Sequence, residues 1–107
     1  MVYTIDELKS KIAPIAERYN IPAVYLFGSY ARGEATDDSD VDVLFQRSGS
    51  TVRGMLIGGL YNDLCESLDK EIDLITEEAL DQPDVQRRTP WFKENLQAER
   101  LLIYERQ

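Results

Sequence analysis

The stretch LFGSYARGEATDDSDVDVLF, residues 26–45, decides the fold expected of this chain. It leaves an apolar segment, turns at Gly28, crosses a polar loop and enters an alternating run of aspartate and valine. This run, 40–45, predicts a strand. Residues two positions apart in a strand point to the same face. Asp40 and Asp42 should therefore project together, while the valines that follow each of them face the core.

Two neighbouring carboxylates repel each other and are costly to desolvate, so this strand needs a compensating charge. Mg²⁺ supplies one, because it binds carboxylate oxygens and keeps substrate phosphates as further ligands. Two such ions can hold the attacking and leaving oxygens of a phosphoryl transfer. Asp73 lies in another strand-like segment and joins the same site if its strand lies beside 40–45. The alternative is a half-exposed strand with a solvated polar face.

The residues before the loop favour a phosphate ligand. Gly28 directly follows an apolar strand, and a glycine there permits a tight turn and a close backbone approach. Ser29 then adds a hydroxyl to a short helix whose free N–H groups attract anions. Arg32 adds a cation one turn later. The structural alternative is an ordinary turn, with Arg32 solvated or paired with Glu34 or Asp38.

The remaining patterns alternate between helix and strand. A capping box at Thr4 and Glu7 begins a helix, which Pro14 either kinks or divides into two pieces. The further expected elements are a strand over 23–27, a helix over 51–68, a strand over 71–75, a short helix over 90–97 and a strand over 101–104. This order predicts an α/β (α+β) fold in which helices pack a small mixed sheet.

The composition narrows the function further. The chain has 107 residues, which suits a single domain over 1–107, and a net charge of −8. This charge argues against direct nucleic-acid binding, which needs a basic face. With one cysteine, no histidine and no apolar run of about 18 residues, we expect a cytoplasmic protein without a membrane segment or histidine catalysis.

Taken together, residues 28–45 resemble the nucleotidyltransferase signature of the DNA polymerase beta superfamily: Gly-Ser, then Arg-Gly, then Ser-Asp-x-Asp and a hydrophobic residue. The chain is most similar to the minimal nucleotidyltransferase domains of that superfamily, and the resemblance implies a polymerase-beta-like fold. It also implies a set of site residues. Those expected to bind the nucleotide are Gly28, Ser29, Arg32 and Ser39. The expected catalytic residues and metal ligands are Asp40, Asp42 and Asp73.

The resemblance further implies an activity and a partner. Minimal nucleotidyltransferases commonly pair with a HEPN-domain toxin as its antitoxin, and attach AMP from ATP to a tyrosine of the toxin. We therefore expect Mg²⁺ (two ions), ATP and a HEPN protein as cofactor, substrate and partner. Two alternatives stay open. One is a catalytically silent antitoxin that acts by binding alone, and the other is nucleotidyl transfer to a small-molecule or RNA hydroxyl.

Overall fold

The computed structural model describes residues 2–52, 54–81 and 98–106. Helices and strands alternate along the chain, as the sequence predicts. In chain order they are α1 (Ile5–Arg18), β1 (Ala23–Phe27), α2 (Gly28–Arg32), β2 (Val41–Phe45), α3 (Leu56–Leu68), β3 (Ile72–Thr76), the 3₁₀ helix η1 (Glu78–Asp81) and β4 (Leu101–Glu105). The helix expected over 90–97 lies outside the described residues.

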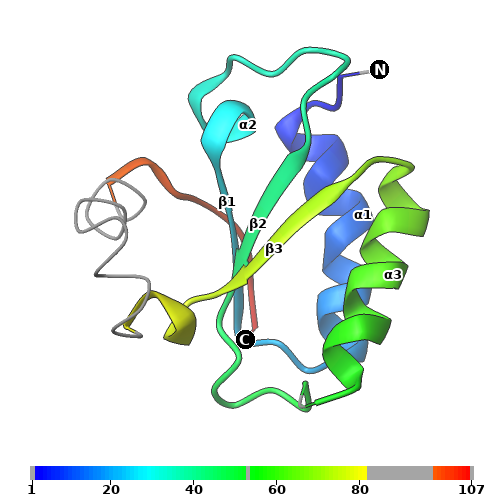
Figure 1. Cartoon of the computed structure of the whole chain (residues 1–107), viewed down its shortest axis with the longest axis vertical. Helices are drawn as coiled ribbons and strands as arrows, with labels where there is room; N and C mark the ends of the chain where they lie inside the picture. The colour runs from blue at the N-terminus through cyan, green and yellow to red at the C-terminus, as the bar shows by residue number, and fades with distance from the viewer. Residues whose placement is uncertain (1, 53, 82–97, 107) are drawn as a thin grey trace.

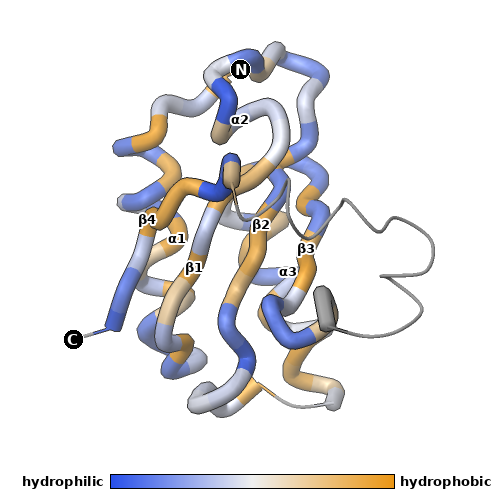
Figure 2. The backbone as a smooth tube through the Cα atoms, turned by 90° about the vertical axis from the view of Figure 1, so that its left-hand side faces the viewer, coloured by the Kyte–Doolittle hydropathy of each residue, from blue (hydrophilic) through white to orange (hydrophobic). Residues whose placement is uncertain are grey.

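The four strands form one mixed sheet in the order β3-β2-β1-β4. β1 is antiparallel to both β2 and β4, whereas β2 and β3 are parallel and are connected through α3. Figure 1 shows α1 and α3 side by side on one face of the sheet, with α2 at one end of it. In Figure 2 the strands lie in front of these two helices, so the opposite face of the sheet is in view.

The first helix begins as its capping box predicts. The Thr4 side chain accepts a hydrogen bond from the Glu7 backbone N–H at 3.1 Å, and the Glu7 carboxylate accepts one from the Thr4 backbone N–H at 2.9 Å. These bonds satisfy donors that a helix start would leave unpaired. One helix contains Pro14, so the alternative of two helical pieces is wrong.

The second long helix begins later than expected, at Leu56 instead of position 51. Val52 continues the four-residue spacing of the apolar helix positions, but Gly54 and Met55 lie in a turn, in which Gly54 has φ of +52°. This backbone conformation is incompatible with a right-handed helix and suits glycine. Val52 is fully buried although it lies before the helix, which explains why its position fitted the hydrophobic pattern.

The main core fills the space between the helices and the sheet. It combines α1 and α3 residues such as Leu8 and Leu64 with strand residues such as Leu26 and Val43. Removing such side chains from water supplies the main driving force for folding. The opposite face of the sheet carries a smaller cluster around Phe27 and Leu44. Within the described part of the chain, no helix combines the length and the apolar character needed to cross a membrane.

Candidate active site

The predicted site residues lie at one end of the sheet. β1 ends at Phe27, directly before Gly28, and its antiparallel neighbour β2 begins at the same end. β3 is parallel to β2, so it also begins there, and Asp42 is in register with Asp73. The condition set for Asp73 to join the site, a third strand beside the second, is therefore met. Asp40 precedes the first residue of β2 and is exposed.

Gly28 and Asp42 are in close contact. Gly28 has φ of +71°, and a Cβ added to it would lie 3.0 Å from Cγ of Asp42 and closer still to Oδ2. Both the backbone conformation and the space require glycine here. The side chain of Asp42 therefore lies directly against the turn between β1 and α2, where the sequence predicts phosphate binding.

Negative charge accumulates around Asp42. Burial, followed by the charges of Asp73 and Asp40, raises the pKa of Asp42 from 3.8 to about 6. Like charges and poor hydration both disfavour the ionised form. No hydrogen bond or ion pair from the described residues reaches the Asp42 side chain. Arg32 opposes this rise only in part, so the described residues leave a net demand for positive charge at Asp42.

The donor set suits a hard divalent cation such as Mg²⁺, which prefers carboxylate oxygens. In the described ranges, however, no three histidine, cysteine, aspartate or glutamate side chains converge tightly enough to form a ready-made metal site. Mutual repulsion favours side-chain conformations that keep carboxylates apart, whereas a cation would favour their convergence. The assignment of Asp40, Asp42 and Asp73 as metal ligands stays a prediction.

The two serines have different environments. Ser29 is in the first turn of α2 and is half-buried, next to the Gly28 turn. Ser39 stabilises the loop before β2, because its hydroxyl accepts a hydrogen bond from the Thr36 backbone N–H at 2.8 Å and lies 3.3 Å from the Thr36 hydroxyl. Ser39 therefore shapes the approach to Asp40, and its predicted contact with a nucleotide stays a prediction.

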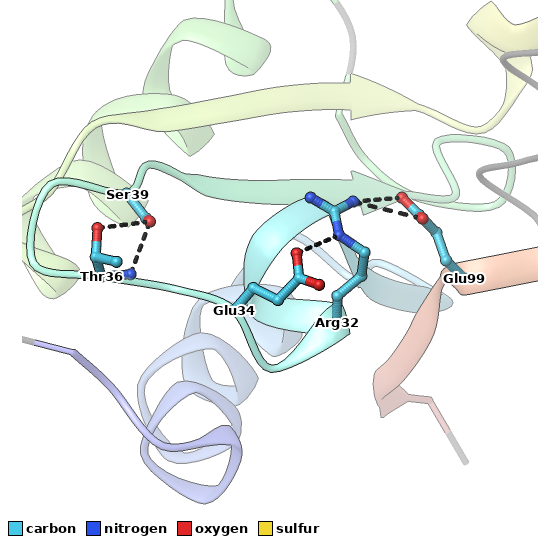
Figure 3. A network of polar contacts seen from close by, with 5 residues as sticks. All are labelled: Arg32, Glu34, Thr36, Ser39 and Glu99. Atoms are coloured by element: carbon cyan, nitrogen blue, oxygen red, sulfur yellow. Dashed lines mark hydrogen bonds and ion pairs between the residues drawn. The ribbon is translucent and has the colours of Figure 1, made fainter.

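Arg32 is held by two carboxylates (Figure 3). Its Nε donates to Glu34 at 3.1 Å, and its Nη1 donates to Glu99 at 3.2 Å. The sequence suggested the Glu34 pair as the structural alternative, but it did not reveal Glu99. Since β4 is antiparallel to β1, its first residue lies at the site end of the sheet, which brings Glu99 close to α2. No local pattern in the sequence encodes this contact.

The family model described as Polymerase beta, Nucleotidyltransferase matches residues 10–107. This chain belongs to the polymerase beta nucleotidyltransferase family. It is a nucleotidyltransferase with a minimal nucleotidyltransferase domain, as the resemblance implies. The matched range includes the Gly-Ser turn and all three aspartates.

Two relatives of this nucleotidyltransferase carry the name protein adenylyltransferase. MJ1379 of Methanocaldococcus jannaschii, an inferred protein adenylyltransferase, is 30% identical over 92 residues, which cover 78% of this chain and 89% of the relative. The protein adenylyltransferase MntA of Thermococcus cleftensis is 42% identical over 45 residues, covering 38% of this chain and 46% of MntA.

Two solved structures share the fold of this chain. A chain in a toxin–antitoxin crystal structure with AMP-PNP superposes with a TM-score of 0.69 at 21% identity, over 92% of this chain and 74% of that one. An inferred minimal nucleotidyltransferase superposes with a TM-score of 0.65 at 27% identity, over 92% of this chain and 95% of that one. The polymerase-beta-like fold predicted from the sequence is thus confirmed.

Proposed function

We propose that this nucleotidyltransferase attaches AMP from ATP to a hydroxyl of a HEPN toxin, in particular a tyrosine, and so acts as its antitoxin. The observation that carries this proposal is the contact of Asp42 with Gly28, with Asp73 in register beside Asp42 and Asp40 directly before β2 at the same end of the sheet. The names of the relatives support protein adenylylation. The fold shared with a chain of a toxin–antitoxin crystal structure supports the biological role.

The chemistry follows from the residues at this end of the sheet. Asp40, Asp42 and Asp73 would hold Mg²⁺, which when bound neutralises charge on the triphosphate and on the departing pyrophosphate. Gly28 and Ser29 would seat the phosphates, since the glycine turn leaves the backbone accessible. Positioning and charge neutralisation would supply most of the rate enhancement.

The proposed reaction is a single in-line displacement. The acceptor hydroxyl oxygen forms a bond to the α-phosphorus of ATP, and the bond between the α-phosphorus and the oxygen bridging to the β-phosphate breaks. Asp73 accepts the proton of the hydroxyl, and pyrophosphate leaves with the electron pair of the broken bond.

A protein acceptor suits the charge of the chain. The net charge of −8 favours docking to a basic protein, because complementary charges accelerate association and orient the partners. A HEPN toxin that cleaves RNA needs a basic surface for its substrate. The same basic surface would be attracted to this chain.

The test uses the protein with Mg²⁺, ATP labelled at the α-phosphate and the product of the neighbouring gene. We expect label on a protein of the neighbour's mass, and loss of that label with Asp42→Asn. Asp69→Asn is the matched control, because Asp69 is exposed and has φ of +51°, a conformation that asparagine also favours. This control should label as the parent does.

The outcomes separate the alternatives. Label that depends on Asp42 supports the proposal, and mass spectrometry of the labelled peptide then identifies the acceptor residue. A stable complex that silences the toxin without label, even in the Asp40→Asn and Asp42→Asn double variant, supports binding alone. Label on a small molecule or an RNA end in place of a protein contradicts the proposed acceptor.

A further inference from the structure

The Arg32 guanidinium connects three parts of the chain at the site. Arg32 ends α2, Glu34 lies in the loop that follows, and Glu99 comes from the segment directly before β4, 67 positions away (Figure 3). The Arg32 and Glu99 side chains are 44% and 33% exposed. Solvent can therefore reach the pair, and a ligand can displace one member of it without opening the core.

Both members of the pair lie at the site end of the sheet. Arg32 ends α2, the short helix that begins at Gly28 in contact with Asp42. Glu99 precedes β4, whose first residue is paired with Leu26 at the same end. Glu99 therefore neutralises the positive charge on which an incoming triphosphate would depend.

The two glutamates occupy different nitrogens of Arg32. Glu34 accepts from Nε at 3.1 Å, and Glu99 accepts from Nη1 at 3.2 Å through one oxygen and 3.5 Å through the other. A guanidinium offers five donors in a fixed plane and binds phosphate well through neighbouring nitrogens. A phosphate can thus replace Glu99 at Nη1 while Glu34 keeps the orientation of Arg32.

We propose that Glu99 is an internal competitor for the nucleotide: a phosphate that binds Arg32 through Nη1 and Nη2 together must displace the Glu99 carboxylate from Nη1. Glu99 is therefore a residue that sets nucleotide affinity. The Arg32–Glu99 ion pair links α2 to the segment before β4, and nucleotide binding would break this link. This inference rests on the proposed nucleotide site at Gly28, Ser29 and Arg32.

The residue after Glu99 is anchored independently. Arg100 pairs with Glu77 at 2.8 Å, and its guanidinium lies 4.3 Å from the centre of the Tyr25 ring. Leu101 then begins β4 opposite Leu26. Release of Glu99 therefore need not detach the strand, and the exchange at Arg32 stays a local event.

The test measures binding of α,β-methylene-ATP with Mg²⁺ to the full chain by calorimetry, because this analogue cannot donate AMP. We expect Glu99→Gln to tighten binding about two- to fivefold, the range that an exposed ion pair supports. Glu105→Gln removes the same charge from the far end of β4, where Glu105 pairs with Ala23. This matched control should bind as the parent does.

A double-mutant cycle with Arg32→Gln separates direct competition from a general charge effect. We expect Arg32→Gln to weaken binding, and Glu99→Gln to have no further effect in that background. An equal gain from Glu99→Gln with and without Arg32, or no gain in either background, would overturn the inference while leaving the nucleotide site intact. Failure of the parent chain to bind the analogue would overturn the inference together with the proposed function.

Discussion

Replacing Asp42 with asparagine should make the metal-free protein more stable while abolishing nucleotidyl transfer. The ionised Asp42 carboxylate is poorly hydrated and faces Asp73 and Asp40, and these effects raise its pKa to about 6. An amide of nearly the same shape removes the charge and retains the packing against Gly28. The aspartate required for chemistry would thus be a liability for folding when no cation is bound.

The shift sets an upper limit on the gain. A rise in pKa from 3.8 to about 6 corresponds to at most about 3 kcal/mol, since each unit is worth about 1.4 kcal/mol. Asp42 is only half-buried, and solvent screening reduces this figure. We therefore expect Asp42→Asn to raise the free energy of unfolding by about 1 kcal/mol at pH 7.5 in EDTA, which is a rise in Tm of about 5 °C.

The pH dependence has a definite direction. A folded-state pKa above the unfolded value means that the folded protein binds the proton more tightly. The parent therefore loses stability as the pH rises from about 4 through 6. The advantage of Asp42→Asn should be absent near pH 3.5, should grow between pH 4 and 6, and should be constant above that range.

Urea unfolding followed by circular dichroism at several pH values measures this effect, with Asp69→Asn as the control. A variant that is no more stable than the parent at pH 7.5, or equally stabilised at pH 3.5 and 7.5, would refute the electrostatic reasoning. Mg²⁺ provides a second comparison. It should stabilise the parent more than the Asp42→Asn protein, because the variant lacks one carboxylate ligand.

Two further substitutions test the scaffold of the site. Gly28→Ala should destabilise the protein by about 1 kcal/mol or more and abolish transfer, because the added methyl group overlaps with Asp42 and φ is +71°. Thermal unfolding and the label-transfer assay measure these two effects. A fully active variant would contradict the close contact between Gly28 and Asp42. Thr4→Ala should lower the free energy of unfolding by about 1 kcal/mol, because it removes the N-terminal cap of α1. Transfer should be unchanged at a temperature where the variant stays folded. Urea unfolding measures the loss, and Thr4→Ser, which keeps the hydroxyl, is the control that isolates the capping hydrogen bond.

The fold was predictable from the sequence wherever local rules and burial agree. The capping box at Thr4, the apolar segment before Gly28 and the alternation after Asp40 each lie in the expected element. The predicted start of α3, at position 51, was wrong because the buried Val52 lies at helical spacing from the helix residues that follow. There the backbone conformation of Gly54 prevailed over the hydrophobic pattern.

The site was predictable in part. The alternation of Asp40 and Asp42 at the start of β2 is local, although the strand itself begins one residue later than expected, at Val41, and the pairing with Asp73 follows once two strands are neighbours. The capture of Arg32 by Glu99 depends on the placement of β4 beside β1, which spans most of the chain. No local spacing rule describes such a contact, so the charge balance of the site needed the structure.

The position of β4 also has a consequence for biosynthesis. Its neighbour β1 is complete at Phe27, but β4 ends about eighty residues later, at Glu105. At about 5–20 residues per second, the ribosome leaves one edge of β1 without a partner for several seconds. An open strand edge can recruit other chains during this interval. Slow codons between the two strands should therefore lengthen this interval and lower the yield of folded protein through aggregation. The activity of the molecules that do fold should stay the same.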